Sequence, residues 1–242
     1  MKGKDKRPVK LIEKTWSFND TVAENFDLHV NQSIPHYSEL QNYLVQLSEW
    51  FLKDNETVYD LGCSTGETIK KLLELDISTR TKIIGIDKSK KMLDLAREKI
   101  KKVKNNNVKV TFEVADVSSG FELEDCNLVL STLLFPFLNF DNRKLLLKKI
   151  YQSLQKGGAL IAVEKVRSRN STFEDLLNQL YYDFKLSKNL SEKEIILKAK
   201  SLRSSMSLYT EEDLFKTIED SGFKEHEIFF KCFNFVGYIA LK

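Results

Sequence analysis

The sequence predicts an α/β fold in which helices cover a mostly parallel, doubly wound sheet of seven strands. Short β-branched runs alternate with longer stretches of helical periodicity, which is typical of a parallel sheet. The chain closes on two β-rich runs with a short break between them, and this pattern predicts a hairpin that adds an antiparallel strand. With 242 residues, of which 42% are hydrophobic and 30% charged, the chain can bury the core of one large domain.

Five apolar, β-branched runs come before the final hairpin, and we expect strands at 56–61, 82–86, 108–114, 126–131 and 158–164. Helical spacing of apolar residues predicts the helices between them. The first is expected to have Ser64 or Thr65 as its N-cap, and the second carries Met92 on its apolar face. The third is expected to end at Gly157 and Gly158.

The pattern changes after the fifth strand. Residues 171–207 have helical character and no strand signal, and a further helix is expected from a cap at Thr210 to Gly222. We therefore interpret the chain as one domain with four parts: an N-terminal lid with helices (1–54), a binding core (55–165), a helical insertion (166–208), and a C-terminal helix with the hairpin (209–242).

Charge and cysteine content argue against several classes of protein. Lys and Arg number 38 against 35 acids, for a net charge of +3, so direct nucleic-acid binding is not expected. Cys63, Cys126 and Cys232 lie far apart without CxxC spacing, which indicates reduced thiols rather than a metal site or disulfides. No run approaches the ~18 apolar residues of a membrane span. We expect a cytoplasmic protein with a small-molecule substrate, no metal and no membrane contact.

The segment D-L-G-C-S-T-G, residues 60–66, follows the first strand and poses the question of what it binds. In such a sheet the ligand lies outside the carboxyl ends of the strands. The spacing G-x-S-x-G lacks the third glycine of a dinucleotide motif, and Asp60 would repel a pyrophosphate. By itself the turn is ambiguous, because glycine also simply permits positive φ.

Acidic residues after three consecutive strands resolve part of that ambiguity. Asp60, Asp87 and Asp116 match the cationic and donor groups of S-adenosyl-L-methionine (SAM): its ammonium and sulfonium, its ribose hydroxyls and its adenine amino group, respectively. Asp87 could instead be only a helix N-cap. The three acids together favour SAM as the cofactor.

At this point the sequence resembles a known family, the carboxy-S-adenosyl-L-methionine synthases, a branch of the Rossmann-like class I SAM-dependent methyltransferases. The resemblance runs from about Trp16 to Lys242. It is carried by W-x-F-N-D-T-V-A-E-N-F, S-I-P-H-Y, V-Y-D-L-G-C-S-T-G, K-I-I-G-I-D, K-I-Y-Q-S-L-Q-K-G-G-A-L, E-K, D-F-K followed by L-S-E-K-E-I, S-G-F, and C-F-N-F before the terminal A-L-K. S-I-P-H-Y and C-F-N-F are the most specific of these motifs, because a general methyltransferase does not need them.

The resemblance implies a homodimer whose helical insertion covers the active site. It implies cofactor contacts from Tyr37, Gly62, Cys63, Ser64, Asp87, Lys88, Asp116 and Val117. Asp60, Gly66, Met92 and Ser131 complete the predicted cofactor-binding set.

Two positions depart from the family pattern. Ser131 stands where the family has Asn, and Ala199 where it has Arg. In the family's reaction the carboxyl lost by prephenate is attached to the SAM methyl group, and the Arg holds the new carboxylate. Alanine offers no such fork of donors, although Lys198, Lys200 or Arg203 could reach in instead.

The leading hypothesis is therefore a SAM-dependent methyltransferase of a small acceptor. Candidate catalytic residues are His36 and Tyr37 of the lid, Glu164 and Lys165 after the fifth strand, and one of Tyr181 and Tyr182, since neighbours on one helix should not both face inward. His36 could equally be a packed lid residue. The alternatives are a carboxy-SAM synthase that serves tRNA wobble-uridine modification, with carboxy-SAM as its product, and a catalytically silent SAM-binding protein.

Overall fold

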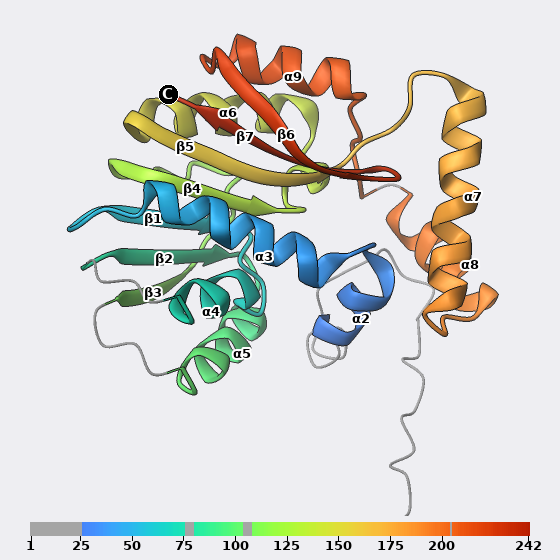
Figure 1. The fold of residues 1–242 in the computed structure, drawn as a ribbon, viewed down its shortest axis with the longest axis horizontal. Helices are drawn as coiled ribbons and strands as arrows, with labels where there is room; N and C mark the ends of the chain where they lie inside the picture. The colour runs from blue at the N-terminus through green and yellow to red at the C-terminus, as the bar shows by residue number, and fades with distance from the viewer. Residues whose placement is uncertain (1–25, 76–79, 104–107, 204) are drawn as a thin grey trace, which may run out of the picture.

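The computed structural model describes residues 26–75, 80–103, 108–203 and 205–242, which form one seven-stranded sheet with helices on both faces (Figure 1). The part of the expected lid before Phe26 lies outside these residues, as does most of the first family motif. Within the described ranges, none of the helices combines the length and the apolar character needed to cross a membrane.

The strands of the sheet are β1 (Thr57–Leu61), β2 (Lys82–Asp87), β3 (Lys109–Val114), β4 (Cys126–Thr132), β5 (Leu154–Lys165), β6 (Glu225–Cys232) and β7 (Phe235–Leu241). Their order is β3-β2-β1-β4-β5-β7-β6. The first five pair in parallel, whereas β7 runs antiparallel to both of its neighbours. The predicted fold class is confirmed, including the antiparallel strand that the final hairpin contributes.

Helices cover both faces of this sheet, as continuous apolar strands require. Helices α3 (Tyr37–Ser48), α4 (Glu67–Leu73) and α5 (Lys90–Ile100) lie on one face, and α6 (Phe140–Ser153) and α9 (Glu211–Asp220) on the other (Figure 1). Leu40, Ile69 and Leu93 are fully buried in the core of the first face, and Leu147 and Leu214 in that of the second.

The predicted end of α6 is wrong. The helix ends at Ser153, and β5 begins directly afterwards at Leu154 rather than at residue 158. Gly157 (φ +79°) and Gly158 lie within β5, where the pairing with β4 shifts register between Cys126 and Leu128. The glycines therefore accommodate a β-bulge instead of stopping a helix.

The predicted N-cap of α4 is also wrong. Gly66 (φ +72°) occupies the N-cap position, and no side chain caps the helix. The Thr65 hydroxyl instead donates to Asp27 of the lid at 2.6 Å. A tertiary contact has replaced the local capping interaction that the sequence suggested. Thr210 does cap α9, accepting from the Asp213 N–H at 3.1 Å.

The lid and the insertion meet at the carboxyl ends of the strands. The lid helix α2 (Phe26–Ser33) lies close to the insertion helices α7 (Ser171–Ser187) and α8 (Glu192–Leu202) (Figure 1). The Tyr181 hydroxyl of α7 donates to the Ser33 carbonyl at 2.8 Å, and Gln32 donates to the Lys188 carbonyl at 3.1 Å. Short 3-10 turns, η1 (Glu49–Phe51) and η2 (Phe135–Phe137), complete the described elements.

Candidate active site

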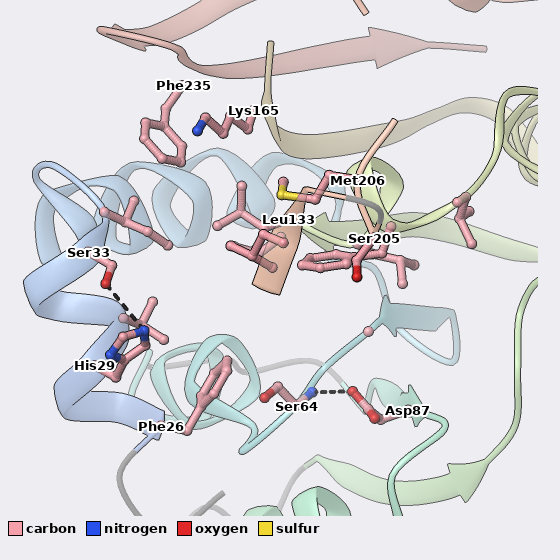
Figure 2. Close-up of a pocket in the computed structure, with 18 of the residues that line it drawn as sticks. Phe26, His29, Ser33, Ser64, Asp87, Leu133, Lys165, Ser205, Met206 and Phe235 are labelled. Atoms are coloured by element: carbon pink, nitrogen blue, oxygen red, sulfur yellow. Dashed lines mark hydrogen bonds between the residues drawn. The ribbon is translucent and has the colours of Figure 1, made fainter. Parts of the chain in front are cut away.

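A cavity of about 790 Å³ lies where the carboxyl ends of the strands face the lid and the insertion. This volume is within the range of small-molecule sites. Ser64 and Asp87 lie on one side of it, while Lys165 and Phe235 lie on the other (Figure 2). His29 and Ser33 of α2 form a third wall (Figure 2).

Asp60 lies near the carboxyl end of β1 and lines the cavity. Its side chain is buried, and its Oδ2 atom has no hydrogen-bond partner among the described residues. Burial, and secondarily the charge of Asp87, raises the pKa of Asp60 to about 7. A buried carboxylate oxygen without a donor is the place where a cationic ligand group is most strongly favoured.

Glycine is required at the start of the loop after β1. The N–H groups of Gly62 and Cys63 donate to the Ile86 carbonyl at 2.8 and 3.0 Å, which holds the loop against β2. Gly62 has φ +70°, and a Cβ atom there would lie 3.0 Å from the Cβ of Leu134. A larger residue would therefore be strained by this backbone conformation and would crowd Leu134.

Asp87, at the end of β2, ties the two loops together. Its Oδ2 accepts from the Ser64 N–H at 3.0 Å, and its Oδ1 accepts from the Ser89 N–H at 2.8 Å. Burial raises the pKa of Asp87, although both hydrogen bonds counteract the shift. The N-cap of α5 is Ser89, which accepts from the Met92 N–H, so capping does not account for Asp87.

Asp116 follows β3 at an exposed rim of the cavity. Its Oδ1 accepts from the Ser118 hydroxyl at 2.6 Å and from the Ser118 N–H at 2.9 Å. These bonds lower the pKa of Asp116, so the carboxylate is ionised and oriented. The three acids that the sequence singled out thus share one cavity.

Most of the predicted cofactor-binding residues line this cavity. They are Tyr37, Asp60, Gly62, Cys63, Ser64, Asp87, Lys88, Asp116 and Val117. Gly66, Met92 and Ser131 are not among the lining residues. Met92 is fully buried beneath the loop, where its sulfur accepts from the Ser64 hydroxyl at 3.6 Å. A Cβ on Gly66 would lie 2.9 Å from that of Ala96, which indicates a packing role.

The predicted catalytic residues are divided between the cavity and other places. Tyr37 and Tyr182 line it, whereas His36 is exposed in a left-handed turn before α3 and does not. Glu164 is fully buried outside the cavity, where it pairs with Arg143 at 3.1 Å and accepts from the Tyr238 hydroxyl at 2.8 Å. Because alternate strand residues face opposite sides of a sheet, Lys165 faces the cavity and Glu164 does not.

The expectation that only one of Tyr181 and Tyr182 faces inward is wrong, since both line the cavity. Their ring centroids are 6.4 Å apart. Helix α7 passes along the edge of the cavity, so two adjacent side chains can flank it from one helix.

Lysines from three secondary-structure elements line the cavity, and the sequence pattern gave little indication that they would meet there. Lys165 of β5, Lys185 of α7 and Lys198 of α8 all line the cavity. The Nζ atoms of Lys165 and Lys185 lie 4.8 and 3.8 Å from the centroid of the Tyr181 ring. The sequence pattern indicated Lys165 and Lys198 only as candidates and gave no signal for Lys185 or His29.

The environment of these lysines disfavours their charged forms. Burial, followed by the charge of Lys165, lowers the pKa of Lys185 to about 7. Burial and the other two lysines lower the pKa of Lys198 well below its usual range, and burial lowers that of Lys165. A bound anion would reverse these shifts, so this half of the cavity fits an anionic ligand.

The residues present therefore fit SAM in one half of the cavity. The carboxylate of Asp60 suits its ammonium and sulfonium, and the side-chain oxygens of Asp87 and Asp116 can accept from its hydroxyl and amino donors. Lys165, Lys185 and Lys198 line the other half.

Comparison with known proteins identifies the family. Residues 58–158 match the family described as "Methyltransferase domain". A carboxy-S-adenosyl-L-methionine synthase of Staphylococcus epidermidis is 34% identical over 228 residues, which cover 94% of this chain and 97% of that protein. A protein of the same name from Cronobacter sakazakii is 34% identical over 227 residues, covering 94% and 91%.

Among solved structures, an O-methyltransferase family protein from Burkholderia thailandensis superposes with a TM-score of 0.68 at 14% identity. The match covers 93% of this chain and 60% of that one, and at this identity it establishes the fold alone. Together, the near full-length relatives and the SAM-compatible site show that this chain is a SAM-binding enzyme of class I methyltransferase fold and belongs to the carboxy-S-adenosyl-L-methionine synthase family.

Proposed function

We propose that the protein is a carboxy-S-adenosyl-L-methionine synthase that combines SAM with a small carboxylate, prephenate. The observation that carries this proposal is the convergence of Lys165, Lys185 and Lys198 on the cavity that also holds the three cofactor acids. The family relationship at 34% identity supports it. The sequence alone favoured methyl transfer because Ala199 lacks the family guanidinium, but Lys198, next to it, does reach the cavity.

The lysines supply what a carboxylate substrate needs. Each brings N–H donors into a site largely shielded from water, where charge-assisted hydrogen bonds are strong. Lys165 and Lys185 flank the face of Tyr181, which limits the positions that they can occupy. The aromatic rings beside them, including Phe235, offer an apolar surface for the ring of the substrate.

SAM supplies a methyl carbon activated by its sulfonium, onto which the ring carboxyl of prephenate moves, while the ring hydroxyl and one methyl proton leave as water. The protein's own contribution is binding and positioning. Asp60, Asp87 and Asp116 hold one reactant, the lysines hold the other, and α2 with α7 and α8 excludes water. The product would then serve wobble-uridine modification of tRNA.

Methyl transfer to a small acceptor remains the second candidate because of two specific positions. Ala199 lines the cavity without any hydrogen-bonding side chain, and Ser131 is buried with no partner for its hydroxyl among the described residues. Both differ from the family pattern. An anionic acceptor would suit the same lysines.

Mass spectrometry of the cofactor decides between the two reactions. The protein is incubated with SAM and prephenate, and the expected product is SAM carrying one additional carboxyl group on its methyl. Formation of S-adenosylhomocysteine with an acceptor, and no carboxylated cofactor, would contradict the synthase proposal and support methyl transfer.

A matched pair of variants tests the part played by the lysines. Lys185→Met should raise KM for prephenate at least tenfold, because it removes one charge-assisted hydrogen bond of about 1.5–3 kcal/mol. Lys188→Met removes an exposed lysine from the end of the same helix and should leave KM unchanged. Equal effects of the two substitutions would show that only the general charge of α7 matters.

A further inference from the structure

The lid contributes a histidine that contacts one of the cavity lysines. His29 lies on α2 and Lys198 on α8, 169 residues apart in sequence, and their Nε2 and Nζ atoms form a hydrogen bond. Lys198 also donates to the Ser33 hydroxyl at 3.4 Å, and that hydroxyl lies 3.4 Å from His29 Nε2. Figure 2 shows His29 and Ser33 next to each other at the cavity wall.

The direction of this hydrogen bond follows from the surroundings of the ring. Burial, then the charges of Lys198 and Lys185, lowers the pKa of His29 to about 3, so the ring is neutral near physiological pH. Nε2 of a neutral ring can accept, and the amino group of Lys198 carries donors in either protonation state. His29 therefore acts as an acceptor that fixes the end of the Lys198 side chain.

A lysine whose amino group is already fixed loses less conformational entropy on binding a ligand than a mobile lysine does. A lysine has a long stem with many rotamers, and ordering it on binding weakens affinity. Here two groups of one helix restrict Lys198 before any ligand arrives. Ala199 follows Lys198 and is too short to bond a ligand's oxygens itself, so the anion-binding role at this end of α8 falls to its neighbour.

We propose that His29 is a positioning residue that, with Ser33, orients the amino group of Lys198 toward the carboxylate of the second substrate. This inference rests on the proposed function, because it assumes that the second substrate carries a carboxylate. It assigns to the lid a part in substrate selection in addition to that of covering the cofactor.

Two substitutions of His29 separate positioning from simple packing. His29→Leu keeps bulk but removes the acceptor, and should raise KM for prephenate about tenfold while the Kd for SAM stays within twofold. His29→Gln replaces the acceptor with a side-chain carbonyl and should restore KM to within threefold of the wild-type value. Equal KM values for the Leu and Gln variants, or an equal loss of SAM affinity in the Leu variant, would overturn the inference.

The effect must also pass through Lys198. In a Lys198→Met background, His29→Leu should change KM less than twofold, because the group that it orients is gone. A full tenfold effect in that background would contradict a positioning role. Asn31→Ala provides the control on α2, because the exposed Asn31 amide donates to the Asp27 carbonyl of the same helix at 2.7 Å, and it should alter neither KM nor Kd.

A readout without turnover separates this inference from the proposed function. Labelling of amines with acetic anhydride, followed by peptide mass spectrometry, measures how far prephenate protects Lys198. Protection in the wild type that falls at least fivefold in His29→Leu supports the inference even if no carboxylated cofactor forms, in which case only the synthase proposal fails. Absence of protection in the wild type would overturn the inference itself.

Discussion

Asp60 places a buried carboxylate at the cavity, and its ionisation should control cofactor affinity. Its raised pKa of about 7 means that the folded protein holds more protons than the unfolded chain between about pH 4 and 7. The stability contributed by Asp60 is therefore greatest below this window and is lost as pH rises through it. The cationic groups of SAM favour the ionised form, so binding opposes this loss.

The consequence is a pH-dependent affinity for SAM. Titration calorimetry should show the Kd falling about eightfold between pH 6 and 7.5, as the ionised fraction of Asp60 increases. Asp60→Asn should weaken binding at pH 7.5 and flatten most of this dependence. An unchanged slope in Asp60→Asn would contradict this assignment.

At the scale of secondary-structure elements, the lid helix is tied to the cofactor loop by one small network. Thr65 donates to Asp27 at 2.6 Å, and Lys99 pairs with Asp27 at 2.7 Å and with Glu67 at 2.9 Å. The network joins α2 to the loop before α4 and to α5. It holds the lid over the half of the cavity that is lined by Asp60 and Asp87.

Removal of one hydroxyl should loosen that connection. Thr65→Val is nearly isosteric and removes the bond to Asp27 together with the one that the hydroxyl accepts from Lys99 at 3.1 Å. We expect it to raise the Kd for SAM about fivefold, which corresponds to a net loss of about 1 kcal/mol. Thr111→Val is the matched control, because the Thr111 hydroxyl on β3 is buried without a hydrogen-bond partner in the described part of the chain. Similar Kd values for the two variants would show that the lid contact does not contribute to binding.

The insertion helix α7 has an exposed apolar stripe that supports the expected homodimer. Phe173, Leu176 and Leu180 follow helical spacing and are 61%, 55% and 49% exposed. We expect Leu176→Glu to convert a dimer into a monomer, as measured by light scattering. Leu145→Glu, at a 59% exposed position on α6, should leave the mass unchanged. A monomeric wild-type protein would contradict the expectation.

At the scale of the whole molecule, a buried ion pair joins elements on the face of the sheet away from α3 to α5. Arg143 of α6 is fully buried, pairs with Glu164 of β5, and donates to the carbonyls of Phe135 and Ser207 at 2.7 and 2.9 Å. Its guanidinium also lies over the Tyr209 ring at 4.5 Å. This network holds α6 and the segment before α9 against β5.

Loss of the carboxylate charge should affect stability and not cofactor binding. Glu164→Gln leaves Arg143 as a buried cation without its counter-ion, which costs about 3 kcal/mol of unfolding free energy. Denaturant titration measures this loss, and the Kd for SAM should remain within twofold. Arg143→Met with Glu164→Leu should recover part of the stability, because no buried charge remains. A large loss of turnover in Glu164→Gln at full stability would instead favour the catalytic role that the sequence suggested.

The sequence by itself determined the strands, the doubly wound class and the meeting of three acidic side chains in one cavity. These follow from local rules, because strand periodicity and the carboxyl ends of parallel strands place Asp60, Asp87 and Asp116 at one edge. Motifs alone also indicated the family. Local rules failed where tertiary contacts compete with them, as at Thr65, which contacts the lid instead of capping α4.

Only the tertiary structure decided the composition of the second half of the site. Which of Glu164 and Lys165 faces the cavity depends on the orientation of β5 relative to its covering helices, and the sequence pattern does not record this orientation. The meeting of His29 with Lys198 depends on how the lid and the insertion pack over the sheet. Charged side chains from distant segments can bind one ligand only after folding brings them into the same cavity. Electrostatic interactions are stronger there than in water, because the protein interior has a low dielectric constant.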